Sequence, residues 1–249
     1  MELQPADSAL FRTAIEGLKD MLSVAQLHIT KAGLRISGMD AVHVVFVSYT
    51  LSAKDCTVLK APMNVTIGLS LAVLAKVLAP IGASDTLTLK STGEHLVVTL
   101  VNEKLKKKTV CNVPLLDLTV DELEIPELTY ATTVEAKTAD MAALFKEVGA
   151  FGDTVTLSLD ADGFKASANN EMGAMTQVLE REEGRKMIST ERVKPVGFGT
   201  KYLIAMLKSA LSPQVRLQMN EETPMCVGYK VGTESSLVFH LAPKLGDEA

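Results

Sequence analysis

Two segments with one pattern, LHITKAGLRIS at residues 27–37 and LSLDADGFKAS at residues 157–167, decide the fold of this chain. In each segment apolar and polar residues alternate, a glycine (Gly33 or Gly163) interrupts the alternation, and the alternation then resumes. This pattern predicts two strands joined by a tight turn. An amphipathic helical segment precedes each pattern, and the patterns begin 130 residues apart, which exceeds the length of solenoid repeats. We therefore predict two copies of one domain.

The composition is that of an ordinary globular protein. The 249 residues suffice for two domains with separate cores, and 47% of them are hydrophobic and 22% charged. The first residues lack the basic flank and the apolar run of a secretion signal, and no apolar stretch is long enough to span a membrane. We therefore expect an intracellular protein with no membrane partner.

The charge and the cysteines narrow the classes of function. A net charge of −5 disfavours a protein whose whole surface attracts nucleic acid, although it permits a local basic surface. Cys56, Cys111 and Cys226 are odd in number, widely spaced and never form a C-x-x-C pair. We expect three reduced thiols, no disulfide framework, no metal site and no cofactor.

Four segments have helical periodicity, two in each half of the chain. Their apolar stripes consist of Leu10, Phe11, Ala14, Ile15, Leu18 and Leu22; Leu71, Leu74, Val77, Leu78 and Ile81; Met141, Leu144, Phe145 and Val148; and Tyr202, Leu203, Met206, Leu207 and Ala210. Most other segments alternate like short strands, at residues 42–50, 56–59, 86–90, 96–101, 154–159, 214–219, 225–230 and 237–241. Each half is therefore predicted to be α+β, with two helices covering one face of a sheet.

A connector joins the two halves. The segment LLDLTVDELEIPELTY at residues 115–130 is acidic, yet it presents Leu118, Leu123, Ile125 and Leu128. Pro126 pushes the residue before it toward an extended conformation. The apolar side chains either pack on the sheet or border a surface that another molecule fills. We predict domain 1 at residues 1–116, the connector at 117–130 and domain 2 at 131–249.

The helices carry cations at comparable places in both halves. These cations are Arg12, Lys19, Lys76, Lys146, Lys201 and Lys208. A charged face is the default for a solvated helix, and Glu16, Asp20 and Glu147 lie nearby. If the helices line one concave surface, the cations would instead contact phosphates without reading bases, which gives salt-dependent binding that is indifferent to sequence.

Five strings together resemble a known family. They are GMDAVHVVFVSYTL at residues 38–51, LEIPE at 123–127, FGDTVTLSLDADGFKAS at 151–167, GFGTKYL at 197–203 and HLAPKLGDE at 240–248. In this combination and order they resemble the eukaryotic and archaeal sliding clamp, proliferating cell nuclear antigen, along essentially the whole chain. The resemblance implies two alike domains per subunit, with sheets outside and two helices each on the inner face. It also implies three subunits closed head to tail into a ring around double-stranded DNA.

The resemblance assigns a function to each surface. The six helix cations would face the DNA duplex, and a front-face pocket would receive short peptide motifs of DNA polymerase, clamp loader, flap nuclease and ligase. The residues of this pocket would be Met39, His43, Val44, Phe46, Leu123, Ile125, Pro126, Pro224, Leu241, Ala242, Pro243 and Lys244. An apolar cavity for anchoring side chains is the usual basis of such capture.

The chain departs from the family's pattern at the pocket and at one hairpin. His240 stands where tyrosine is common and Phe46 where a smaller aliphatic residue is common, so we expect a different set of fitting peptides. Ala161 stands nearest to the lysine that many relatives use for ubiquitin attachment, so switching through that position is not expected. His43 lacks the further ligands of a metal site, and with Asp40 it has no nucleophile for a hydrolase.

By the same resemblance, two strand edges would join neighbouring subunits. They contain Lys107, Lys108, Thr109, Val110 and Cys111 on one side and Thr176, Gln177, Val178, Leu179 and Glu180 on the other. Unpaired edges pair readily with a second chain, and the basic run at 104–108 and the acidic run at 180–183 would favour the head-to-tail register. Both runs are also compatible with solvated loop ends, and the basic run with a nuclear import signal.

The expected function is that of a sliding clamp, which serves as polymerase processivity factor and as docking platform for replication and repair proteins. We expect no enzymatic activity, since the sequence contains no P-loop, G-x-S-x-G or H-E-x-x-H motif. Two alternatives are a subunit of a heterotrimeric checkpoint-type clamp and a monomeric factor that holds DNA by charge. The expected location is the nucleus in a eukaryote, or the replication site of a virus.

Overall fold

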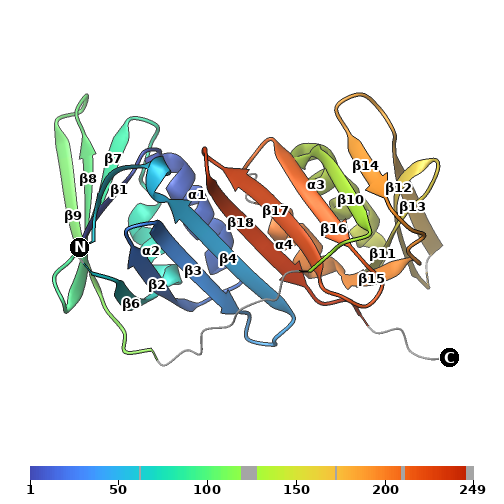
Figure 1. The fold of residues 1–249 in the computed structure, drawn as a ribbon, viewed down its shortest axis with the longest axis horizontal. Coiled ribbons are helices and arrows are strands. Elements are labelled where there is room, and N and C mark those ends of the chain that lie inside the picture. Colours follow the sequence, from blue (N-terminus) through green and yellow to red (C-terminus); the bar gives the residue numbers. More distant parts are fainter. Residues whose placement is uncertain (62, 119–127, 172, 209–210, 245–249) are drawn as a thin grey trace. The chain divides into compact units, whose positions relative to one another are not determined.

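The computed structural model describes residues 1–61, 63–118, 128–171, 173–208 and 211–244 (Figure 1). Of the predicted residues, Leu123, Ile125, Pro126 and Ala210 lie outside these ranges. The chain forms two compact units. Unit 1 consists of Met1–His43, Val47–Glu124 and Lys230–Leu237, and unit 2 consists of Val44–Phe46, Ile125–Tyr229 and Val238–Ala249. The division predicted at residues 116 and 131 stays a prediction.

Unit 1 is built from strands of two antiparallel sheets and from two helices. One sheet has the strand order β5 (Cys56–Lys60), β1 (Glu2–Pro5), β7 (Asp85–Ser91), β8 (His95–Asn102) and β9 (Lys107–Pro114). The other contains β6 (Val65–Ser70), β2 (Val24–Thr30), β3 (Gly33–Met39) and β4 (Val45–Ser52), and the short 3-10 helix η1 (Ala53–Asp55) leads from β4 to β5. The helices α1 (Ser8–Lys19) and α2 (Leu71–Leu78) pack against each other and against strands of both sheets.

The helices of unit 1 follow from local signals in the sequence. The side chain of Asp7 caps α1 by accepting a hydrogen bond from Leu10 N at 2.8 Å, which satisfies an open amide of the first turn. The apolar stripe of α1 is buried, with Phe11, Ala14, Ile15 and Leu18 at most 1% exposed. α2 ends at Leu78, shortly before Pro80, which cannot continue a helix. Ile81, predicted as part of this stripe, therefore lies beyond the helix, although it is buried.

Unit 2 repeats this plan. In one sheet, β14 (Lys186–Ser189), β10 (Thr132–Lys137), β16 (Gln214–Met219), β17 (Met225–Val231) and β18 (Ser235–Leu241) follow one another in this order. A four-stranded sheet has the order β13 (Gly173–Glu180), β12 (Gly163–Asn170), β11 (Thr154–Leu159) and β15 (Val196–Gly199). α3 (Thr138–Val148), followed by the 3-10 helix η2 (Gly149–Phe151), packs beside α4 (Thr200–Leu207). The predicted α+β class with two helices in each half is confirmed. None of the described helices combines the length and the apolar character needed to cross a membrane.

The two repeated sequence segments form equivalent hairpins. β2 pairs with β3 and β11 pairs with β12, with Gly33 and Gly163 as the first residues of the second strands. Their φ angles are 141° and 144°, a region that favours glycine. A Cβ atom would lie 2.0 Å from Leu51 O at the first position and 2.2 Å from Leu179 O at the second. The predicted strand–turn–strand repeat is confirmed, and the chain needs glycine at both turns for the same reason.

One predicted strand begins later than the sequence suggests. Alternation at residues 42–50 predicts a strand, but β4 begins at Val45. The preceding residues form a turn in which His43 N donates to Asp40 O at 3.0 Å, and the φ of His43 is 57°. A positive φ is incompatible with a strand. The predicted start at Val42 is therefore wrong, and this valine is a loop residue that is 61% exposed.

Candidate DNA interface, subunit edges and docking surface

The six predicted DNA-contacting cations lie on helices or directly at a helix end. Arg12 and Lys19 are on α1, Lys76 is on α2, Lys146 is on α3, Lys201 is on α4, and Lys208 is the C-cap of α4. All except Arg12 are exposed. Because each helix buries its apolar stripe within its own unit, the exposed residues of the two helices face away from the core of that unit.

In unit 1, two cations have close partners. One guanidinium nitrogen of Arg12, Nη1, donates to Ile81 O at 2.6 Å, and its Nε lies 3.7 Å from a carboxylate oxygen of Glu16. Lys19 Nζ lies 3.4 Å from the carboxylate of Asp20. Arg12 thus connects α1 to the residue that follows α2, and its charge is partly compensated. Lys76 has no hydrogen bond or ion pair with any residue in the described ranges.

In unit 2, close partners are found for the acids of α3. The acids of α3 are held by residues of distant segments: Arg185 Nη2 lies 3.0 Å from Asp140, and Gln177 Nε2 donates to Glu147. Lys146 is exposed and has no ion pair within the described part of the chain. Lys201 Nζ lies 4.6 Å from the ring centroid of Tyr202, a contact that leaves its positive charge in place.

The residues that hold the acids of α3 were missed by the sequence analysis. Gln177 lies 30 positions from Glu147, and Arg185 lies 45 positions from Asp140. No helical or strand period connects residues so far apart. The pairs arise because β13 and the loop after it fold back beside α3.

The predicted docking pocket is represented in unit 2 by the start of β4 and by the segment after β18. Ala242 N donates to Val44 O at 3.0 Å, which holds this segment beside β4. Lys244 is fixed by its amine, which donates to Thr154 Oγ1 at 2.6 Å and to Asp153 O at 3.3 Å. The segment therefore has a defined place on unit 2.

Two predicted pocket residues are buried. Leu241 is fully buried and Phe46 is 6% exposed. The ring of Phe46 lies 6.3 Å from that of His240, and Tyr130 Oη, 3.5 Å from His240 Nδ1, donates to Pro224 O at 3.2 Å. Burial lowers the pKa of His240, which favours its neutral form. Pro224, Ala242 and Pro243 are half-buried, and so supply the accessible apolar surface here.

The remaining predicted pocket residues belong to unit 1 or fall outside the described residues. Met39 is half-buried at the end of β3, and His43 is exposed in the turn before β4. The connector residues Leu123, Ile125 and Pro126 are among those that the structure does not describe.

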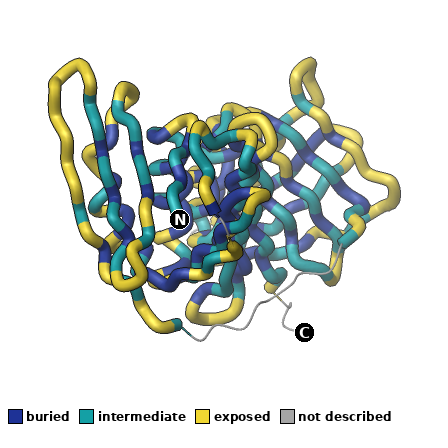
Figure 2. Tube along the Cα trace, turned by 60° about the vertical axis from the view of Figure 1, so that its left-hand side comes forward, coloured by how far each residue is buried: buried dark blue, intermediate teal, exposed yellow. Residues whose placement is uncertain are grey.

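The two predicted subunit edges are the last strands of their sheets. β9 follows β8 at one end of its sheet, and β13 follows β12 at one end of its own. Both strands are largely exposed, β9 along almost its whole length (Figure 2). Val110 on β9 is 55% exposed and Val178 on β13 is 38% exposed. Each strand therefore offers backbone donors and acceptors together with an apolar side chain.

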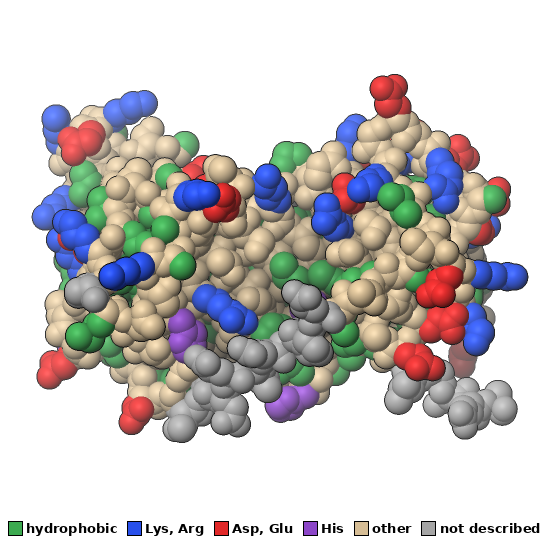
Figure 3. Space-filling view, in the orientation of Figure 1, with side chains coloured by type: hydrophobic (Ala, Val, Ile, Leu, Met, Phe, Trp, Pro, Cys, Tyr) green, Lys and Arg blue, Asp and Glu red, His purple; other side chains and the backbone are tan. Residues whose placement is uncertain are grey.

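The two edges differ in charge. Lys and Arg side chains gather over β8 and β9 (Figure 3), and the lysines at 104 and 106–108 are all exposed and form no salt bridge with a described residue. Near β13, two arginines bind groups of their own unit. Arg181 donates to Met187 O at 2.7 Å, and Arg185 binds both Asp140 and Glu182. The exposed acids at 180 and 183 remain without a salt bridge to any described residue.

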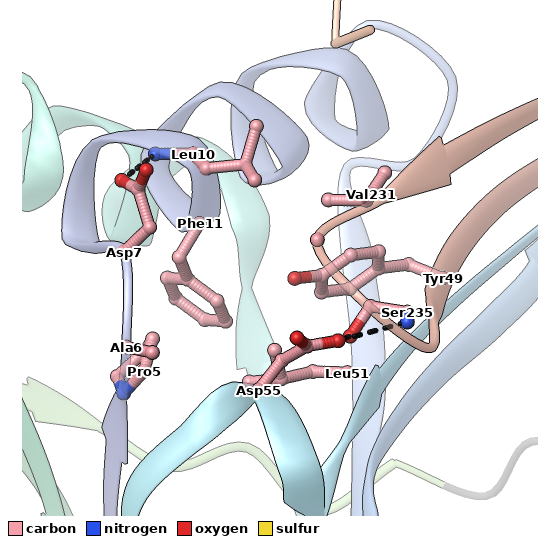
Figure 4. A pocket seen from close by; sticks show the side chains of 11 residues that line it. Pro5, Ala6, Asp7, Leu10, Phe11, Tyr49, Leu51, Asp55, Val231 and Ser235 are labelled. Atoms are coloured by element: carbon pink, nitrogen blue, oxygen red, sulfur yellow. Dashed lines mark hydrogen bonds between the residues drawn. The ribbon is translucent and has the colours of Figure 1, made fainter.

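A small cavity of about 50 Å³ in unit 1 lies between α1, β4 and the β17–β18 turn (Figure 4). Its carboxylate, Asp55, accepts hydrogen bonds from Thr233 N at 2.8 Å, from Glu234 N at 2.9 Å, and from Ser235 N and Oγ at 2.9 and 2.6 Å. Three of these bonds reach one carboxylate oxygen and one reaches the other. Asp55 therefore holds the turn between β17 and β18.

Comparison with known families assigns the chain. A family described as "Proliferating cell nuclear antigen, N-terminal domain" matches residues 1–124, and one described as "Proliferating cell nuclear antigen, C-terminal domain" matches residues 124–244. The chain belongs to the proliferating cell nuclear antigen family. It is 29% identical to the proliferating cell nuclear antigen of Chaetomium thermophilum, over 100% of this chain and 99% of that protein. The resemblance predicted from the sequence is confirmed.

Membership of this family makes the chain a DNA sliding clamp of replication, a class of protein that works without covalent chemistry. Two matched domains account for the repeated α+β plan. Among the described residues, no three His, Cys, Asp or Glu side chains lie together as a possible metal site.

Proposed function

We propose that this chain forms a homotrimeric ring that encircles duplex DNA, holds polymerase on its template and docks further replication and repair proteins. The observation that carries the proposal is the set of exposed cations on the helices of both units, combined with the family assignment. In a eukaryote, this role places the protein in the nucleus.

The helix cations suit contact with a moving duplex. Lys76, Lys146 and Lys201 are exposed single charges on helices. Such charges attract phosphates regardless of sequence. A closed ring would keep the protein on the DNA for a long time. The individual contacts could therefore be weak, which would allow the clamp to slide.

We propose that β9 of one subunit pairs with β13 of the next. Both edges are unpaired within the described chain, and each presents a valine. The lysines at 107 and 108 on one edge and Glu180 on the other would attract each other across the interface and disfavour pairing of like edges. An edge of each kind in one chain supports self-assembly head to tail.

Partner peptides are proposed to dock on the surface of unit 2 that Pro224, Ala242 and Pro243 form beside Val44. The pocket roles of Met39 and His43 in unit 1 and of Leu123, Ile125 and Pro126 in the connector stay predictions. Half-buried apolar residues on a fixed chain segment are suitable for anchoring aromatic or aliphatic side chains. Phe46, Leu241 and His240 would form the floor, and Lys244 would position the segment through its bonds to Asp153 and Thr154. The polymerase, clamp loader, flap nuclease and ligase would use this surface in turn.

The decisive experiment combines mass and topology. Light scattering of the purified chain should give three times the chain mass of 26.7 kDa. After loading on nicked circular DNA, the protein should stay bound through gel filtration and be lost when the circle is linearised. Retention on linear DNA would instead support a charge-based factor. A monomeric mass, with a trimer only after addition of other subunits, would support a heterotrimeric clamp.

A further inference from the structure

An open groove on unit 1 lies at an edge that the proposed ring does not use. Its volume is about 610 Å³, and three segments line it: residues 65–68 of β6, the turn between β7 and β8 around Gly93, and residues 115–117 after β9. β6 is the last strand of its sheet. The groove thus lies along a strand edge.

This edge is open at Thr66 in the described part of the chain. Leu116 N donates to Gly68 O at 2.8 Å, which shows that the backbone groups of Gly68 point away from β2. Residues two apart in a strand point the same way, so the N–H and C=O of Thr66 also point outward. No described backbone group bonds to Thr66 on this side.

The segment that follows β9 meets this edge at Gly68 and then leaves it. Gly68 permits its close approach, since a Cβ there would lie 2.4 Å from Leu116 O. Beyond that point the chain turns toward Gln26, whose side-chain amide donates to Leu118 O. Pairing with β6 is therefore an isolated bridge at Gly68, and Thr66 is left for another strand.

The groove carries negative charge, which favours a basic ligand. Glu94 and Asp117 are exposed, and neither has an ion pair or hydrogen bond with a side chain that the structure describes. Among the residues that the structure describes, no lysine or arginine lines the groove. Leu116, 38% exposed, and the half-buried Val65 add apolar surface. A strand with basic residues at alternate positions would match this surface in both charge and polarity.

We propose that this groove binds an extended basic peptide of a partner protein, which adds to β6 as a further strand. Backbone hydrogen bonds to Thr66 supply the register, and lysine or arginine side chains pair with Glu94 and Asp117. The proposal goes beyond the clamp function and does not depend on ring closure.

The test uses the full-length protein and the fluorescein-labelled peptide Lys-Val-Lys-Thr-Lys-Val-Lys, with binding followed by anisotropy. Thr66→Pro removes the outward N–H without breaking the ladder to β2, and we expect at least about tenfold weaker binding. Thr66→Val keeps the amide and is expected to bind like the wild type. Glu94→Gln with Asp117→Asn should weaken binding several-fold at low salt, whereas Glu103→Gln with Asp162→Asn, two exposed acids elsewhere, should not.

A second peptide separates strand addition from simple charge attraction. The same sequence with N-methylated amides keeps its charges but loses its backbone donors, and we expect it not to bind. Equal binding of both peptides, unchanged binding by Thr66→Pro, or no anisotropy change at millimolar protein would overturn the proposal. Self-association that Thr66→Pro abolishes would assign the groove to a second copy of the chain instead. Retention of the Thr66→Pro variant on circular DNA tests the proposed clamp function independently of the groove.

Discussion

The helix pairs of the two units carry equal numbers of predicted DNA-contacting cations, but the two units differ in which residues contact the neighbouring acids. In unit 1, Glu16 and Asp20 lie beside Arg12 and Lys19 on or next to the same helix. In unit 2, the acids of α3 are bound by residues outside the helices. A cation beside a carboxylate attracts a phosphate less than an uncompensated one. We therefore expect unit 2 to supply more of the attraction to DNA than unit 1.

The largest effect is expected from Arg185→Ala, which breaks the arrangement in unit 2. The Arg185 side chain is 15% exposed and binds Asp140, Glu182 and Glu180 O. Its removal leaves Asp140 partly buried without its cation, and we expect a loss of about 2–3 kcal/mol in the free energy of unfolding. Urea denaturation measures this loss. The matched control is Lys186→Ala, which removes a 3.8 Å pair with Glu135 at a 55% exposed side chain and should cost under about 0.5 kcal/mol.

Equal losses in the two variants would show that Arg185 is only another surface charge. The difference between the units would then reduce to sequence spacing, with no role for the loop after β13.

The next effect concerns DNA directly. Lys146→Gln with Lys201→Gln should weaken binding to a short labelled duplex by about tenfold at low salt, and should reduce the salt slope by about 0.9 for each phosphate that the protein no longer neutralises. Arg12→Gln with Lys19→Gln removes the same formal charge but from compensated positions, so we expect less than half that change. Anisotropy over a salt series measures both. A larger loss from the unit 1 pair would reverse the comparison.

Sequence predicts the elements of this fold better than its charge pairing. The glycine-interrupted repeat and the apolar stripes follow from short-range periods. The repeat appears where expected, and so do the stripes among the described residues, except that Leu22 and Ile81 lie beyond the ends of α1 and α2. The turn at His43 was missed because the apolar residues around it alternate as in a strand, although only a positive φ fits there. β1, β6, β10, β14 and β15 were not predicted. β1, β14 and β15 have only four residues each, which carry too little periodicity to be recognised.

In the candidate site, too, the positions of residues on their elements could be predicted from the sequence, but the contacts between distant segments could not. Helical spacing placed the cations on exposed helix faces, but it gave no sign that Arg12 reaches Ile81 O or that Lys244 binds Thr154. Those contacts depend on how segments far apart in the chain meet. Phe46, predicted as a residue of the pocket, is buried, and its neighbour His240 comes from a distant part of the chain.

A smaller effect is expected at the most strongly hydrogen-bonded carboxylate of unit 1, Asp55. Burial raises its pKa, but the hydrogen bonds from Ser235, Glu234 and Thr233 outweigh burial and hold the pKa well below the usual range. A lowered pKa means that the bonds stabilise the fold above the unfolded-state pKa, near 3.8, and that this contribution is lost as the pH falls below it. Asp55→Asn should cost about 1 kcal/mol at pH 7 and flatten the loss of stability in acid.

Thermal unfolding at pH 7 and at pH 3 measures this effect. We expect wild type and Asp55→Asn to differ less at pH 3 than at pH 7, whereas a control at the exposed Asp162→Asn should show no such convergence. A constant difference at both pH values would mean that the side-chain shape, not its charge, holds the β17–β18 turn.

The smallest effect is expected from Gln177→Ala, and it tests whether the unit 2 arrangement tunes the DNA surface at all. Gln177 lies on β13, the proposed subunit edge, and its amide holds Glu147, the neighbour of Lys146 on α3. Without that donor, Glu147 is free to sample positions nearer a bound phosphate, so duplex affinity should fall, by less than about twofold because the pair is exposed. Glu147→Gln removes the acid itself, and the double variant with Gln177→Ala should bind at least as tightly as wild type. If Gln177→Ala weakens DNA binding equally with and without Glu147, the residue acts through β13 and ring assembly, and shielding of the acid has no part in the difference between the two helix pairs.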